Sequence, residues 1–160
     1  MLKALTTALT ISCLSGLPAA AQPGSMALSV TGPDRSVTML DLAALDAMPQ
    51  ESFVTSTIWT DGDARFSGVP LAALLERLGV EAEAGTIELV ALNDYRVEIP
   101  IEEIDDSAPI VATRIDGETV PVREMGPYWV VYPYDLDPRY RTEATFARSI
   151  WQLAQVNLVP

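Results

Sequence analysis

One segment of the chain concentrates side chains that can hold a flat, polar ligand. Residues 125–135 read Met-Gly-Pro-Tyr-Trp-Val-Val-Tyr-Pro-Tyr-Asp and contain four aromatic side chains, Tyr128, Trp129, Tyr132 and Tyr134. Tyrosine and tryptophan join an apolar face to a polar group, which suits a pocket for an aromatic heterocycle. Pro127 and Pro133 limit the strand between them to a short piece, because proline donates no hydrogen bond to a sheet. A core strand filled with aromatic side chains fits these residues equally well.

The first 21 residues have the features of a secretory signal peptide. Lys3 supplies a positive start, residues 5–17 are apolar without a charge, and Ala19-Ala20-Ala21 offers a cleavage site. The apolar run is too short for a comfortable transmembrane helix. We therefore expect residues 1–21 to direct export. Residues 22–160, 160 − 21 = 139 in number, are then expected to form a single domain without membrane insertion.

Cleavage after Ala21 would leave a chain with an unusual set of reactive groups. It would remove the only cysteine, Cys13, and the only lysine, Lys3, and the sequence contains no histidine. Nine arginines would then face 22 acidic residues, a formal charge of 9 − 22 = −13. This charge disfavours nucleic acids and highly phosphorylated ligands. The missing thiols and imidazoles exclude typical zinc, copper and iron sites and the usual cysteine or serine–histidine nucleophiles.

Catalysis by carboxylates alone and calcium binding remain open. The acidic run at residues 102–106 lacks the spacing of an EF-hand loop. It is typical of a solvated surface.

Hydrophobic alternation and turn residues predict many short strands with a few short helices. We expect strands at 27–31, 37–40, 53–59, 86–92, 96–99, 109–115, within 127–133 and in 150–159, and helices at 42–48, 71–78 and 142–148. Trp59 would then end a strand beside a polar loop. This mixture predicts an α+β domain.

The order of several short motifs resembles sulfite-oxidase-type molybdopterin-binding domains. The motifs are Phe66-Ser67-Gly68-Val69-Pro70-Leu71 before a leucine-rich helix, the Asp94-Tyr95 turn, the Asp116-Gly117-Glu118 hairpin, Gly126-Pro127 before an apolar strand, and a final segment with Trp151. The resemblance covers residues 53–159. It implies a mixed-sheet α+β fold with short helices and a pterin-binding groove.

The chain also departs from that family in ways that bear on its ligand. Molybdenum-binding members use a cysteine thiolate on the metal, and histidine and basic side chains around the cofactor phosphate. The arginine that they carry four residues before the closing proline is Trp129 here. The chain looks most like the metal-free periplasmic pterin-binding regulators of the superfamily. These report a reduced pterin to an inner-membrane enzyme that makes or degrades cyclic di-GMP.

That resemblance implies a periplasmic, non-catalytic sensor with a reduced, non-phosphorylated pterin as ligand and no molybdenum. Its partner would be the periplasmic domain of an inner-membrane signalling protein. Four segments carry the resemblance to this subgroup. They are Trp59-Thr60-Asp61-Gly62, Ala91-Leu92-Asn93-Asp94-Tyr95, Gly126 to Pro133 around Trp129 and Tyr132, and Trp151-Gln152-Leu153.

A pterin offers a flat ring and a 2-amino-4-oxo edge. We expect Asp94 to accept hydrogen bonds from the N2–N3 edge and Asn93 to bind the carbonyl group. We expect ring stacking from Trp129, Tyr132 or Tyr95, with Trp59 nearby, and an arginine, Arg123 or Arg148, at the 4-oxo oxygen.

Simpler roles compete with these assignments. Asp94 is also a turn residue, Arg123 also suits an ion pair with a neighbouring glutamate, and Trp151 suits the core. Two other functions stay open as well. The first is a subunit of a molybdopterin-dependent oxidoreductase, and the second is a structural protein-interaction module.

Overall fold

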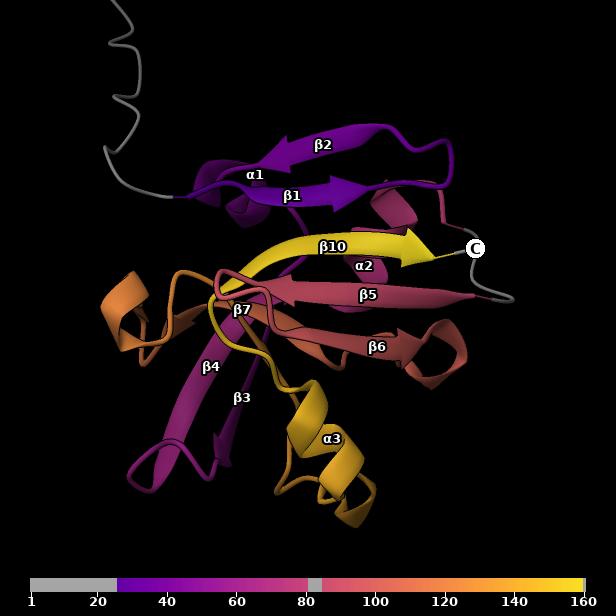
Figure 1. Cartoon of the computed structure of the whole chain (residues 1–160). Coiled ribbons are helices and arrows are strands. Elements are labelled where there is room, and N and C mark those ends of the chain that lie inside the picture. Colours follow the sequence, from indigo (N-terminus) through magenta and orange to yellow (C-terminus); the bar gives the residue numbers. More distant parts are fainter. Residues whose placement is uncertain (1–25, 81–84, 160) are drawn as a thin grey trace, which may run out of the picture.

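The computed structural model describes residues 26–80 and 85–159 (Figure 1). The expected signal peptide lies outside the described residues. The strands are β1 (Leu28–Thr31), β2 (Val37–Leu40), β3 (Glu51–Ser56), β4 (Asp63–Pro70), β5 (Thr86–Ala91), β6 (Arg96–Pro100), β7 (Ile110–Ile115), β8 (Glu118–Thr119), β9 (Trp129–Val131) and β10 (Leu153–Val159). The helices are α1 (Leu42–Asp46), α2 (Leu71–Arg77) and α3 (Glu143–Arg148), with single 3₁₀ turns η1 (Ile101–Glu103), η2 (Val122–Glu124) and η3 (Pro138–Tyr140).

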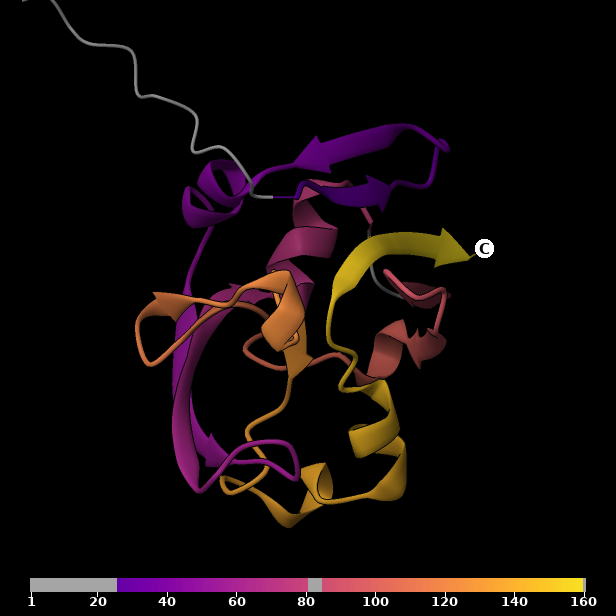
Figure 2. The ribbon, with the colours of Figure 1, turned by 60° about the vertical axis from the view of Figure 1, so that its left-hand side comes forward.

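The strands form two sheets. The first has the order β2-β1-β10-β5-β6, and its one parallel pair joins β1 to β10, near the two ends of the described chain. The second has the order β3-β4-β7-β8, with β9 added beside β7. Figure 2 shows β3 and β4 as a long hairpin on the left and α3 at the lower right, with the first sheet above them. The predicted α+β class is confirmed.

The helices form where the sequence predicts them. Asp41 accepts a hydrogen bond from the Ala44 N–H at 2.8 Å and caps α1. Pro70 precedes α2, whose Leu71, Leu74 and Leu75 are buried. No helix within residues 26–80 and 85–159 combines the length and hydrophobicity that a membrane crossing requires.

The third strand is shorter than predicted. The alternation of residues 53–59 predicts a strand through Trp59, but β3 ends at Ser56. There the Asp135 carboxylate accepts a hydrogen bond from the Ser56 N–H at 2.6 Å, and the Thr57 hydroxyl accepts one from the Trp59 N–H at 3.0 Å. These side chains compete with the sheet for backbone donors. Trp59 therefore lies in the loop between β3 and β4.

The pairing of β4 with β7 requires a glycine where their register shifts. A Cβ atom on Gly68 would lie 2.0 Å from the Val111 carbonyl oxygen and 2.7 Å from the Ala112 Cα. Both are backbone atoms, and the register of the two strands shifts between Ser67 and Gly68. The strands approach closely only because this residue has no side chain.

We predict that Gly68→Ala lowers the free energy of unfolding by about 1–3 kcal/mol, because β4 and β7 must separate to admit the methyl group. Urea denaturation measures the change. The neighbouring Ser67→Ala, which adds no atom between the two strands, is the matched control. Equal stability of Gly68→Ala and the native chain would contradict the close approach.

Candidate functional site

One pocket of the domain is rich in aromatic lining residues and has a volume of about 470 Å³, within the usual range for small-molecule sites. It lies where the β3–β4 loop, the β5–β6 turn and helix α3 with its following segment meet. Its lining residues are Ile58, Trp59, Ala91, Asn93, Tyr95, Glu143, Phe146, Ala147, Ser149, Ile150 and Trp151. Three of the sequence-predicted site residues are among them: Trp59, Asn93 and Tyr95.

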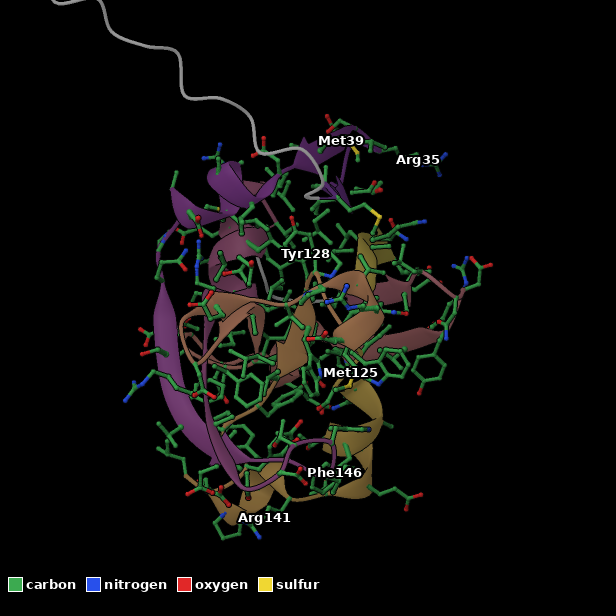
Figure 3. All side chains as sticks on the ribbon, turned by 90° about the vertical axis from the view of Figure 1, so that its left-hand side faces the viewer. Arg35, Met39, Met125, Tyr128, Arg141 and Phe146 are labelled. Atoms are coloured by element: carbon green, nitrogen blue, oxygen red, sulfur yellow. The ribbon has the colours of Figure 1, made fainter. Side chains whose placement is uncertain are left out.

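Aromatic rings make up much of the pocket wall. The ring centroids of Trp59 and Phe146 lie 6.3 Å apart, edge to face. Figure 3 shows Phe146, on α3, close to the tip of the β3–β4 hairpin. Tyr95 stands 49% exposed at the mouth, and its hydroxyl donates to the Ala147 carbonyl oxygen at 3.4 Å. This bond links the β5–β6 turn to α3 across the pocket.

Trp129 lies beneath the pocket and not on its surface. It is 2% exposed, and its Nε1–H donates to the Ser149 carbonyl oxygen at 3.2 Å. Its ring packs edge to face against Trp59 at 5.7 Å and Phe66 at 5.5 Å. Trp129 is therefore not a lining residue of this pocket, although it was predicted to stack on the ligand; its ring contacts Trp59, which in turn contacts Phe146. Trp129 supports the wall from behind.

In the β5–β6 turn, Asp94 lies outside the pocket that its neighbours Asn93 and Tyr95 line. Asp94 adopts a φ of 64°, a turn conformation that short polar residues tolerate. The Asn93 side-chain oxygen accepts the Tyr95 N–H at 3.2 Å and stabilises this turn. Asn93 and Tyr95 line the pocket, whereas Asp94 is not among the lining residues. The structure thus supports the turn interpretation of Asp94.

The two predicted arginines pair with glutamates outside the pocket. The side chain of Arg123 is 82% exposed and lies 3.1 Å from Glu124. Arg148, on α3, forms an ion pair with Glu103 at 2.5 Å. Neither arginine lines the pocket. The contact of Arg123 with its neighbouring glutamate is the simpler role expected from the sequence.

Tyr132 belongs to a buried aromatic cluster that touches the pocket wall only through Tyr134 and Phe146. It is 4% exposed, and its ring lies 5.8 Å from Tyr140 and 6.4 Å from Tyr134. It is not among the pocket residues, and its hydroxyl has no hydrogen-bond partner among the described residues. Burial raises the pKa of Tyr132 above its usual range. Tyr132, which was predicted to stack on the ligand, thus lies outside this pocket.

Sequence reasoning missed the contribution of α3. Glu143, Phe146 and Ala147 follow an i, i+3, i+4 spacing, which places them on one face of that helix. Trp151, expected in the core, is half-buried and lines the pocket. The amphipathic spacing of α3 was visible in the sequence, but nothing in it indicated that this face borders a pocket.

A side-chain cap and backbone hydrogen bonds to the segment 128–130 hold helix α3 in place. The Thr142 hydroxyl accepts the Thr145 N–H at 3.1 Å and caps the start of α3. After the helix, the Val130 N–H donates to the Ile150 carbonyl oxygen at 2.8 Å, and the Leu153 N–H to the Tyr128 carbonyl oxygen at 2.9 Å. The aromatic segment 125–135 thus anchors the pocket wall through its backbone.

A match to the family described as oxidoreductase molybdopterin binding domain extends over residues 15–135. The chain belongs to this family. Its fold also resembles the solved structure of the sulfane dehydrogenase SoxCD from Paracoccus pantotrophus, with a TM-score of 0.62 and 16% identity. The match covers 83% of this chain but only 38% of the SoxCD chain. No curated protein matches.

These comparisons confirm the predicted sulfite-oxidase-type fold. At 16% identity the likeness to SoxCD shows the fold alone. The family relationship establishes a molybdopterin-binding-type domain.

Tyr134, beneath α3, gives the fold a dependence on alkaline pH. Its ring stacks on Phe146 at 4.9 Å and its hydroxyl is hydrogen-bonded to the Ser149 hydroxyl. Burial raises the pKa of Tyr134 to about 12. An unfolded tyrosine ionises near pH 10, so the stabilisation is complete below pH 10 and is lost as the pH rises through 12.

We predict that Tyr134→Phe flattens the fall of stability between about pH 10 and 12, by up to roughly 3 kcal/mol for a pKa difference of about two units. Urea denaturation across this range, with the native chain and the variant in parallel, measures the difference. Parallel curves would show that Tyr134 ionises as easily in the folded chain as in the unfolded one.

Proposed function

We propose that this protein is a non-catalytic binding protein for a reduced, non-phosphorylated pterin and that it acts as a periplasmic sensor. One observation carries the proposal. The pocket of this molybdopterin-type domain is walled by aromatic side chains, and its single charged lining residue within the described chain is a carboxylate, Glu143.

The aromatic walls suit the flat face of a pterin. Four aromatic residues line the cavity: Trp59, Tyr95, Phe146 and Trp151. Stacking of a heterocycle on one such ring contributes about 1–3 kcal/mol. Two stacking faces and one charge-assisted hydrogen bond suffice for micromolar affinity, roughly −8 kcal/mol.

The polar lining residues suit the edge of a pterin. The N2–N3 edge carries adjacent N–H donors, which a carboxylate accepts in a paired, charge-assisted arrangement. Glu143 is the carboxylate available for this role, in place of Asp94. The amide of Asn93 is an N–H donor available to the 4-oxo oxygen.

The complete molybdenum cofactor does not suit the same residues. The pocket lining among the described residues has amide, hydroxyl and carboxylate groups, but no thiol, imidazole or cation. A phosphate group bound here would find no cation among the described lining residues, since Arg123 and Arg148 lie outside the pocket and pair with glutamates. We therefore propose a pterin without molybdenum as the ligand.

The sensor role rests on the predicted export signal and on the resemblance to pterin-binding regulators. In this role the protein reports the pterin to the periplasmic domain of an inner-membrane enzyme that makes or degrades cyclic di-GMP. The pocket mouth is compatible with such a report, since Ile58 is 70% and Tyr95 is 49% exposed there. A partner at the mouth would contact both the rim and the ligand.

A titration of the purified protein with a tetrahydropterin under anaerobic conditions tests the ligand. We predict micromolar binding by calorimetry, and a loss of about 2 kcal/mol in Trp59→Ala because a central aromatic wall is removed. Far-UV circular dichroism checks that the variant is folded. Leu136→Ala, which truncates an exposed side chain outside the pocket, is the control. Failure of every pterin to bind would end the proposal.

A second titration tests the carboxylate. We predict that Glu143→Gln weakens binding of a pterin about tenfold, because an amide accepts only one of the two N–H groups and adds a competing donor. Binding of lumazine, which has an oxygen at position 2, should not weaken. Asp94→Asn is the matched control for charge. A loss in Asp94→Asn with none in Glu143→Gln would return the role to Asp94.

Elemental analysis of protein purified from the periplasm separates the sensor from the oxidoreductase alternative. Stoichiometric molybdenum in the native protein would contradict the metal-free proposal. Pterin binding without molybdenum would support it.

A further inference from the structure

A second groove runs along helix α2 and shares no residue with the pterin pocket. It has a volume of about 670 Å³. A smaller hollow of about 400 Å³ continues it toward the end of α1, and the two share Pro49, Ala73 and Glu76. In Figure 1 this helix lies behind β10 and β5.

The floor of the groove is apolar. Ala72 and Ala73 on the outer face of α2 have short side chains, which leave room above the helix. Leu75, at 4% exposed, and Ile101, at 3%, close the floor from α2 and η1. The remaining apolar lining residues are Pro49, Pro70, Val80 and Ile104.

The charged lining residues of this groove are all acidic. They are Glu51, Glu76, Glu102 and Asp106. None of the four side chains takes part in an ion pair or hydrogen bond with a described residue. Two neighbours differ, since Glu103 pairs with Arg148 and Asp105 with Arg139. One cation, Arg77, lines the smaller hollow. The lining residues of the larger groove itself include four carboxylates and no cation.

We propose that the groove along α2 is a docking site for a basic, amphipathic segment of a partner protein. Apolar side chains of that segment would lie over the alanines of α2, and its lysines or arginines would neutralise the four carboxylates. This surface is independent of the pterin pocket.

Charge complementarity selects this occupant over the others. A second copy of the chain is also strongly acidic, and six of its arginines, 96, 114, 123, 139, 141 and 148, are already in ion pairs. Two copies would repel each other at this surface. Among the described residues no group of three acidic side chains is arranged to hold a metal ion. A basic, amphipathic protein segment matches both the apolar floor and the acidic side chains of the groove.

The probe is a synthetic helical peptide of about 14 leucine and lysine residues with the leucines on one face. Its titration into the pterin-free protein at moderate salt should show saturable binding. Glu76→Gln together with Glu102→Gln should weaken it at least about tenfold, because two of the four carboxylates lose their charge. Asp63→Asn with Glu118→Gln removes the same charge elsewhere and should change affinity less than about twofold.

Two further probes complete the experiment. A scrambled peptide of equal composition and the small cation spermidine should each bind more weakly than the amphipathic peptide. Amide shifts in the NMR spectrum should gather on α2 and η1. Equal binding of the scrambled peptide, or equal loss in both double variants, would overturn the proposal. Pterin affinity should be unchanged in Glu76→Gln/Glu102→Gln, so the two proposals fail independently.

Discussion

The pocket depends on the backbone pairing of the short strand β9 on two sides. On one side Trp129, Val130 and Val131 pair with β7 of the second sheet. On the other, the backbone around Tyr128 to Val130 bonds to Ile150 and Leu153, which follow α3 and begin β10. The three-residue strand β9 therefore connects the second sheet to the segment that leads into β10 of the first sheet. Because α3 is attached through this junction, its aromatic face is held at a defined distance from the β3–β4 loop.

Aromatic packing carries the same constraint into the pocket wall. Trp129 is wedged between Phe66 and Trp59, and its Nε1–H fixes the Ser149 carbonyl group at the end of α3. From below, Tyr134 stacks on Phe146. The pocket rings thus rest on buried rings that are themselves fixed by hydrogen bonds or sheet pairing. Because the wall is preformed, fewer side chains must be ordered when a ligand binds, and the entropic cost of binding is smaller.

The fold was largely predictable because its signals are local. The cap at Asp41, the leucine spacing of α2 and the Asp116-Gly117 turn are read within a few residues, and all appear in the structure. The site was predictable only in part. Trp59, Asn93 and Tyr95 line the pocket, whereas Glu143, Phe146 and Trp151 were not assigned to it. The end of β3 was misplaced because Asp135, far along the chain, takes the Ser56 N–H.

The sequence by itself determined the fold family and the available chemistry, since both follow from residue types and their order. It shows that thiol, imidazole and ammonium groups are confined to Cys13 and Lys3 or missing from the chain. Only the tertiary structure decided which rings face the cavity and which arginines are free. The position of the Trp129 ring is set by its contacts with Phe66 and Trp59. The charge of Arg148 is balanced by Glu103, 45 residues away. Such contacts join distant segments, and no local pattern specifies them.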